Sequence, residues 1–255
     1  MKDTWNGKIA LVTGASCGIG AATGRELAQR GMRVVLVARR LERLQALCDE
    51  IQAAGGQAQA IAADLARPEA RENVYTQTVS YFGVPHVLVN NAGLGWYGYY
   101  HEMSWETAQE MLDVNVAAVM HLTHLFLPAM LQRNSGHIIN MGSIAGTMPN
   151  QGIAIYAASK AFLDAFTTSL YRELVGTRLH VSVIRAGPVA SEFFHSAKKR
   201  PGGRLVPAER FSVSSESVAH SIWRLLQRPR KVLYVPGILR ASLWLEPLFG
   251  WLIDR

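Results

Sequence analysis

A tyrosine and a lysine stand four positions apart, at Tyr156 and Lys160, in a stretch with helical periodicity. Residues with that spacing share one face of a helix, so the two side chains should lie together. A phenol has an unperturbed pKa of about 10, and a neighbouring ammonium favours its ionised form. Such a tyrosine can donate a proton to a carbonyl oxygen or accept one from an alcohol. The pair predicts acid–base chemistry in which Lys160 lowers the pKa of Tyr156.

A serine precedes this pair by 13 residues, at Ser143, directly after a run that is typical of a buried strand. Open α/β sheets bind ligands at the carboxyl ends of their strands. The Ser143 hydroxyl is therefore expected to hold a substrate oxygen beside Tyr156. Serine could instead be a hydrolase nucleophile, but no G-x-S-x-G turn surrounds it.

A glycine-rich turn connects the first expected strand, Lys8–Thr13, with a helix expected over Gly18–Arg30. Gly14 permits a sharp turn, Gly18 leaves room for a pyrophosphate, and Gly20 lets the helix approach the strand. The free N–H groups and the positive dipole end of the helix then face the phosphates. The turn predicts a dinucleotide site, with these candidate residues: Gly14, Ser16, Cys17, Gly18, Ile19 and Gly20.

Three motifs together resemble the short-chain dehydrogenase/reductase family: G-x-x-x-G-x-G at 14–20, Asn-Asn-Ala-Gly at 90–93 and Tyr-x-x-x-Lys at 156–160. The resemblance extends from about Lys8 to Val235. It implies a nicotinamide coenzyme and hydride transfer between that coenzyme and a carbonyl or alcohol. It also implies that Asn115 anchors a water linking the lysine to solvent, and that Lys160 binds the nicotinamide ribose. The implied catalytic group is Asn115, Ser143, Tyr156 and Lys160.

Further coenzyme contacts follow from the same resemblance. The segment 186–191 is similar to the family's carboxamide-binding segment, in which Ala186 and Ser191 replace a proline and a threonine. Serine keeps the hydroxyl. The implied contacts are Asp64 and Leu65 for the adenine, Asn91, Ala92 and Gly93 for the ribose, and Gly187, Val189 and Ser191 for the carboxamide.

Short apolar runs alternate with helical segments, which predicts an α/β fold. The runs are rich in Val, Ile and Leu, as in strands covered on both faces. We expect one Rossmann-like domain over residues 1–255, a doubly wound parallel sheet of about seven strands with helices on both faces. Expected strands are Lys8–Thr13, Arg33–Ala38, Ala58–Ala62, His86–Asn90, His137–Met141, His180–Arg185 and Lys231–Val235. Expected helices are Gly18–Arg30, Leu41–Ala54, Pro68–Phe82, Ser104–Arg133, Gln151–Val175 and Ser214–Leu226.

The residues after the second expected strand bear on the choice of coenzyme. NAD sites of this kind usually place a carboxylate there, which accepts a hydrogen bond from the ribose 2′-hydroxyl. This chain has Ala38-Arg39-Arg40 and no carboxylate at that turn. A guanidinium suits a 2′-phosphate, so Arg39 and Arg40 favour NADP over NAD. The alternative is that both arginines are solvated residues at a helix start.

An irregular stretch over residues 187–211 is long for a loop in a compact domain, which is typical of a substrate lid. Apolar and aromatic residues surround the expected site, so we expect an apolar ketone or secondary alcohol of acyl, steroid-like or aryl type. The alternative is that they only pack the lid. The substrate candidates are Ser143, Trp96, Met148, Ile153 and Phe193, with Leu94, Tyr97, Gln151, Val189 and Phe194 around them.

The 255 residues carry a net charge of +7, which favours anionic partners. No nucleic-acid motif accompanies the basic groups at Arg39–Arg43 and Lys198–Arg204, so nucleic acid is not expected. Cys17 and Cys48 form no metal-ligand pattern; no metal is expected, and reduced thiols are favoured over a single disulfide. The sequence has no signal pattern and no long uncharged apolar span, so we expect no transmembrane segment and a cytoplasmic location.

The segment 236–255 is unusually apolar. It could cover the pocket or a subunit interface, or make peripheral contact with a membrane. Relatives in the resembled family pair through the helix that corresponds to Gln151–Val175, which implies a homodimer or homotetramer. The face of this helix directed away from the expected site carries Ala158, Phe162, Ala165, Phe166 and Ser169.

These observations predict an oxidoreductase that transfers a hydride between NADP(H) and an apolar ketone or secondary alcohol, with Tyr156 as general acid and base. Two other interpretations stay open at this point. One is an NADP-binding redox-sensing protein with little turnover, and the other is a membrane-peripheral lipid reductase.

Overall fold

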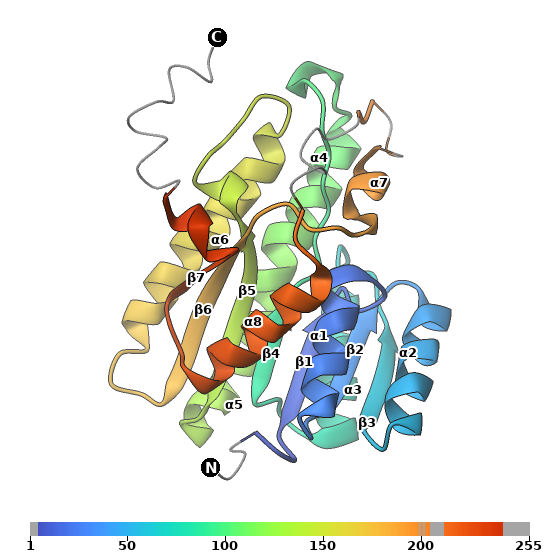
Figure 1. Cartoon of the computed structure of the whole chain (residues 1–255), viewed down its shortest axis with the longest axis vertical. Helices are drawn as coiled ribbons and strands as arrows, with labels where there is room; N and C mark the ends of the chain where they lie inside the picture. Colours follow the sequence, from blue (N-terminus) through green and yellow to red (C-terminus); the bar gives the residue numbers. More distant parts are fainter. Residues whose placement is uncertain (1–4, 199, 201, 205–211, 242–255) are drawn as a thin grey trace.

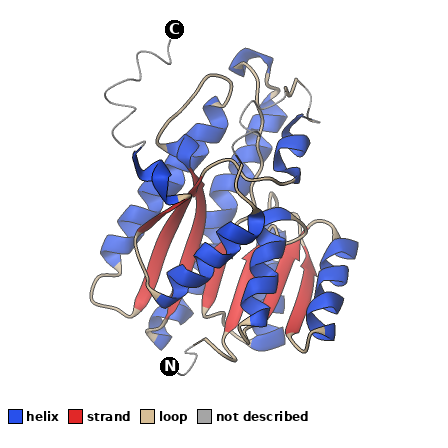
Figure 2. Cartoon of the chain, viewed as in Figure 1, coloured by secondary structure: helices blue, strands red, loops and turns tan. Residues whose placement is uncertain are grey.

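The computed structural model describes residues 5–198, 200, 202–204 and 212–241. In these residues seven parallel strands form one sheet in the order β3-β2-β1-β4-β5-β6-β7 (Figures 1 and 2). The strand order reverses direction between β1 and β4, which is where doubly wound sheets place their ligands. The strands are β1 (Ile9–Thr13), β2 (Arg33–Ala38), β3 (Gln57–Ala62), β4 (Val87–Asn90), β5 (Gly136–Ser143), β6 (Leu179–Ala186) and β7 (Val232–Val235).

Both faces of the sheet are buried beneath helices. Val34 and Leu36 of β2 belong to one apolar core, whereas Val35 and Val37 belong to a second core on the opposite face. Figure 1 shows α1, α2 and α8 in front of the sheet, and the second core is closed by α3, α5 and α6. The helices are α1 (Gly18–Gln29), α2 (Leu41–Ala53), α3 (Pro68–Phe82), α4 (Trp105–Leu112), α5 (Ala118–Arg133), α6 (Ala154–Glu173), α7 (Glu192–Lys198) and α8 (Ser215–Gln227). The predicted doubly wound α/β fold is confirmed.

Differences from the sequence prediction fall at helix ends and in the irregular stretch. The helix expected over Ser104–Arg133 is interrupted by a π-helical turn, Asp113–Ala117, which divides it into α4 and α5. The helix expected from Gln151 begins at Ala154, because Gly152 has a φ of +82° that a right-handed helix cannot contain. Within the stretch predicted to be irregular, residues Glu192–Lys198 form the helix α7.

Within the described ranges, one helical stretch is long and apolar enough to cross a membrane: Trp105–Arg133, which contains an 18-residue window with a mean hydropathy of 1.5. Its inward side belongs to the core, because Leu122, Phe126 and Met130 are buried with the strands of the sheet. Length and composition of this kind are also found in the core helices of α/β proteins.

The first β–α turn brings α1 unusually close to the sheet. A Cβ atom added to Gly20 would lie 2.3 Å from the carbonyl oxygen of Gly14 and 2.6 Å from the amide nitrogen of Asn91. Gly14 and Gly18 have φ angles of +67° and +55°, which glycine adopts without strain. The approach that the sequence predicts for Gly20 is therefore present, and it requires that this position has no side chain.

We predict that Gly20→Ala lowers the free energy of unfolding by about 2 kcal/mol, because the methyl group overpacks rigid backbone. Urea denaturation would measure the change. Gly237→Ala is the matched control, since a Cβ there would have no atom within 4 Å. Equal stability of the two variants would contradict the tight approach of α1.

Candidate active site

One large cavity of about 830 Å³ opens at the carboxyl edge of the sheet. It is lined by residues from the glycine-rich turn, the ends of β2 to β6, and α7. All coenzyme candidates except Gly20 line it, and so do all five substrate candidates. Of the four catalytic candidates, the lining includes Ser143, Tyr156 and Lys160. Gly20 and Asn115 lie behind its wall, and Asn115 is fully buried. The fold therefore brings nearly all of the predicted residues to one cavity.

Tyr156, Lys160 and Ser143 meet where α6 crosses the end of β5. The Lys160 ammonium nitrogen lies 5.7 Å from the centre of the Tyr156 ring and donates to the Met141 carbonyl oxygen at 2.7 Å. Ser143 forms a side-chain hydrogen bond with Tyr156. Its hydroxyl oxygen also accepts the backbone N–H of Ala145 at 3.1 Å, which fixes the serine at the start of a short 3-10 helix.

The pKa values of Tyr156 and Lys160 are both shifted by burial. Burial raises the pKa of Tyr156 above its usual value, and the hydrogen bond with Ser143 opposes the rise. Burial also lowers the pKa of Lys160 to about 8, and the ammonium group is directed at the Met141 carbonyl. A lowering of the tyrosine pKa by Lys160 together with the positive ring of a bound coenzyme stays a prediction.

Asn115 lies in the π-helical turn and joins two elements. Its side-chain oxygen accepts the backbone N–H of Leu94 at 2.8 Å, while its amide nitrogen donates to the Leu94 carbonyl at 3.0 Å and to the Ser159 hydroxyl at 3.0 Å. A Cβ on Gly93 would meet both the Asn115 oxygen, at 3.4 Å, and the Lys160 nitrogen, at 3.6 Å. The asparagine thus lies next to the lysine, across a glycine that keeps them close.

A carboxylate that the sequence analysis did not single out stands one helical turn beyond Lys160. Asp164 is 8% exposed, and its Oδ1 atom accepts the Arg185 guanidinium at 2.9 Å, while its Oδ2 atom has no hydrogen-bond partner among the described residues. Its negative charge raises the pKa of Lys160 against the larger effect of burial. The spacing of four residues from Lys160 is the signal that could have identified it.

We predict that Asp164→Asn lowers the pKa of Lys160 further below about 8, because it removes the carboxylate that favours the charged amine. The ¹³Cε chemical shift of Lys160 followed against pH measures this directly. Asp49→Asn, on α2, removes an exposed carboxylate far from the cavity and is the control. An unchanged titration of Lys160 in Asp164→Asn would show that the carboxylate does not act on it.

The glycine-rich turn fits the phosphates of a dinucleotide. The N-cap residue of α1, Cys17, makes no side-chain capping hydrogen bond, so the first N–H groups of the helix are left for a ligand. A Cβ on Gly18 would lie 3.0 Å from the Cβ of Ser191, so the glycine leaves a narrow passage between the turn and the segment after β6. Gly14, Ser16 and Ile19 complete this part of the cavity wall.

Asn91 follows the end of β4 and joins two strands of the sheet. Its side-chain amide nitrogen donates to the Thr13 carbonyl at 2.8 Å, and the Thr13 hydroxyl accepts the backbone N–H groups of Asn91 and Ala92, each at 3.0 Å. Asn91 therefore holds the end of β4 to the end of β1, although it still contributes to the cavity wall.

The substrate side of the cavity is apolar. The ring centres of Phe193 and Tyr156 are 5.6 Å apart, and Phe193 also packs on Gly95. Leu239, from the start of the apolar C-terminal segment, closes the cavity beside Gly187. Residues 242–255 of that segment lie outside the described residues. The contact of Leu239 agrees with the expectation that segment 236–255 could cover the pocket. Sequence reasoning did not single out these lining residues: Asn150, Glu192, Ser196, Ala197 and Arg200.

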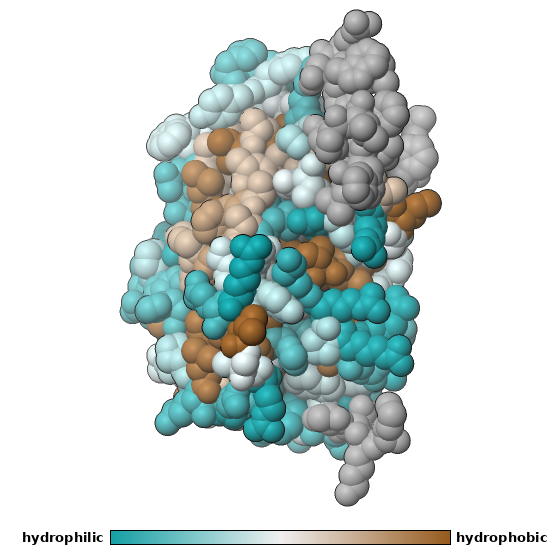
Figure 3. Space-filling model, turned by 90° about the vertical axis from the view of Figure 1, so that its left-hand side faces the viewer, coloured by the Kyte–Doolittle hydropathy of each residue, from teal (hydrophilic) through white to brown (hydrophobic). Residues whose placement is uncertain are grey.

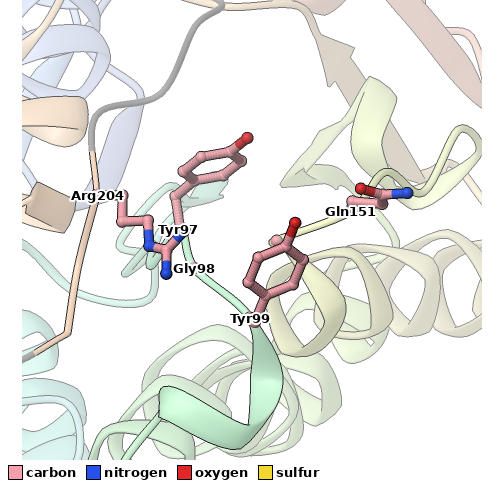
Figure 4. Close-up of a pocket in the computed structure, with 6 residues that line it drawn as sticks. Tyr97, Gly98, Tyr99, Gln151 and Arg204 are labelled. Carbon is pink, nitrogen blue, oxygen red and sulfur yellow. The ribbon is translucent and has the colours of Figure 1, made fainter.

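Two expected substrate residues, Tyr97 and Gln151, do not line this cavity. They line a separate pocket of about 70 Å³ together with Tyr99 and Arg204 (Figure 4). The cause is local: Tyr97 packs on Gly152, so both side chains turn away from Ser143 and Tyr156. Both cysteines are free thiols, as predicted.

The comparison with known proteins agrees with this site. A family model for short chain dehydrogenases matches residues 8–202, so the chain belongs to the short-chain dehydrogenase/reductase family of oxidoreductases. Ketoacyl reductase HetN from Nostoc sp. is 38% identical over 187 residues, which cover 73% of this chain and 65% of that protein.

Two solved structures of similar proteins are complexes with coenzymes. A short chain dehydrogenase/reductase from Burkholderia phymatum in complex with NAD has a TM-score of 0.89 and 26% identity, and the match covers 97% of this chain and 95% of that one. A metagenomic short-chain oxidoreductase in complex with NADP has a TM-score of 0.76 and 35% identity, over 90% of this chain and 96% of that one. Both coenzymes therefore occur among the structural neighbours.

Proposed function

We propose that this protein is an NADP(H)-dependent oxidoreductase that interconverts an apolar ketone and a secondary alcohol. The observation that carries the proposal is the meeting of Ser143, Tyr156 and Lys160 with the glycine-rich turn in one cavity. When bound in this cavity, a reduced nicotinamide would supply the hydride that the carbonyl carbon accepts.

Each residue of the chain has a distinct task in this proposal. Ser143 holds the substrate oxygen beside Tyr156, and the phenol donates its proton to that oxygen as negative charge develops on it. Lys160 binds the nicotinamide ribose and offsets the charge that remains on the tyrosine. Asn115 is a positioning residue, because it holds the Leu94 backbone next to the lysine.

The protonation state of Tyr156 suits the proton donor of the reduction. Because burial raises the pKa of Tyr156, the phenol keeps its proton at neutral pH and is ready to act as an acid. Acting first as a base would require that this pKa falls.

The substrate class follows from the cavity wall. Trp96, Met148, Ile153, Phe193 and Phe194 offer apolar surface beside Tyr156, which suits an acyl, steroid-like or aryl carbonyl. We propose that residues 187–211 act as the cover of this site. The described part of that stretch already contributes Phe193 and Phe194, while residues 205–211 lie outside the described residues.

We predict that purified protein oxidises NADPH in the presence of some members of a panel of apolar ketones, and that Tyr156→Phe loses about 10²–10⁴-fold in kcat. Loss of NADPH absorbance measures both, and the dissociation constant for NADPH should stay unchanged in the variant. Tyr97→Phe removes a hydroxyl from the adjoining pocket and serves as control. Full turnover by Tyr156→Phe would refute the proposed role.

The preference for NADP rests on Arg39 and Arg40, which line the cavity after β2 in a turn whose own residues 38–40 include no carboxylate. We predict that Arg40→Ala weakens NADPH binding by about tenfold and leaves NADH binding unchanged. NADPH would lose a charged hydrogen bond between its 2′-phosphate and the Arg40 guanidinium, whereas NADH has no 2′-phosphate. Titration of intrinsic tryptophan fluorescence measures both constants. Arg25→Ala, which breaks an exposed ion pair with Glu50, is the control. Equal weakening of both coenzymes would contradict the assignment.

We also propose a homo-oligomer formed through the outer face of α6. Ala158, Ala165 and Ser169 are exposed there, while the stacked rings of Phe162 and Phe166, 5.8 Å apart, are half-buried. Figure 3 shows apolar side chains gathered between hydrophilic ones on the side of the molecule that carries α6 and β7. An apolar face of this kind is suited to a second copy of the chain.

A further inference from the structure

The guanidinium groups expected to meet the coenzyme already hold carboxylates. Glu192, the first residue of α7, places one carboxylate oxygen 2.8 Å from an Arg40 nitrogen and the other 2.5 Å from an Arg43 nitrogen. Arg40 also donates to the Ser16 hydroxyl, at 3.3 and 3.0 Å from its other two nitrogens. Glu192 therefore bridges the β2–α2 turn, and through Arg40 it is linked to the glycine-rich turn.

The bridge imitates the contacts that a phosphate would make. A phosphate monoester presents several acceptor oxygens and carries about two negative charges, and arginine pairs bind it through parallel N–H donors. Glu192 offers two acceptor oxygens to two different arginines, and Glu192, Arg40 and Ser16 all line the large cavity. The hydrogen bonds from Arg43 and Arg40 hold the pKa of Glu192 well below its usual value, so the carboxylate is charged at neutral pH.

Arg39, which precedes Arg40 in the β2–α2 turn, is also paired with a carboxylate. Arg39 donates to one oxygen of Glu110 on α4 at 3.1 Å, and Arg200 donates to the other oxygen at 2.9 Å. The residues that follow β6 are thus joined to the coenzyme end of the cavity at two points. At Arg40 and Arg43 it is a described residue of this segment, Glu192, that supplies the negative charge.

The strength of the Glu192 bridge suits a displaceable contact. The side chains of Arg40, Arg43 and Glu192 are 42%, 48% and 43% exposed, and ion pairs this exposed are weak. With Glu192 in place, the two arginines keep one uncompensated positive charge. A 2′-phosphate that arrives beside Glu192 would then leave an excess of negative charge, whereas it would balance the arginines if the carboxylate were neutral or absent.

We propose that Glu192 is a coenzyme-specificity residue, an internal carboxylate that competes with the 2′-phosphate of NADP(H) for Arg40 and Arg43. The inference builds on the proposed coenzyme site and adds the residue that sets its selectivity. It predicts that this protein discriminates between NADPH and NADH less than its arginine-rich turn alone would allow.

The test measures binding and does not depend on turnover. Calorimetric titration of the intact protein gives dissociation constants for NADPH, NADH and 2′,5′-ADP, the last of which carries the 2′-phosphate but no nicotinamide. Glu192→Gln should tighten binding of NADPH and of 2′,5′-ADP by about fivefold, and change the constant for NADH by less than about twofold. Glu50→Gln removes the same charge from an ion pair of similar exposure on α2, outside the cavity, and should change none of the three.

A double-mutant cycle tests whether the effect of Glu192→Gln requires Arg40 and Arg43. In an Arg40→Gln, Arg43→Gln background, Glu192→Gln should no longer tighten NADPH binding, because the shared partners are gone. The proposal is overturned if Glu192→Gln changes NADPH and NADH equally, if its effect survives in that background, or if Glu50→Gln gives the same gain. Absence of ketone reduction, or preference for NADH in the unmodified protein, would count against the proposed function. The ratio of the NADPH dissociation constants of the unmodified protein and Glu192→Gln would still decide this inference.

Discussion

The close approach of α1 to the first strand is the constraint on which the site depends. Gly20 packs where a side chain would collide with the Gly14 carbonyl, and the Asn91 amide occupies the remaining space and donates to Thr13. This contact brings the uncapped start of α1 to the carboxyl edge of the sheet, between β1 and β4. A methyl group added at Gly20 would displace the helix. Its free N–H groups would then move away from the position expected for the phosphates, and the width of the cavity would change.

The second organising feature is a buried lysine, Lys160, in the cavity wall. A buried ammonium is costly, and here the Met141 carbonyl and the Asp164 charge offset only part of the desolvation, so the pKa of Lys160 is lowered to about 8. The same shielding raises the pKa of Tyr156. In this arrangement both groups hold protons near neutral pH.

Charge at the other end of the cavity is shared between elements that are distant in the sequence. From the sequence, the net charge of +7 favours anionic partners. In the fold, Arg39 and Arg40 are each paired with a carboxylate, from α4 and α7 respectively. Binding of a phosphate there is therefore an exchange of partners, and its free energy is the difference between two ionic contacts.

The order of elements, the glycine-rich turn and the Tyr156–Lys160 spacing were determined by the sequence, because each depends on local periodicity, turn geometry or residues close in the chain. The parallel seven-stranded sheet also follows from the alternation of strands and helices. Other features were decided only by the tertiary structure. The raised pKa of Tyr156 depends on how deeply the ring is buried, and Tyr97 turns away because it packs on Gly152. The Arg40–Glu192 pair joins residues 152 positions apart, and no local pattern encodes a contact whose geometry is set by the packing of the whole sheet.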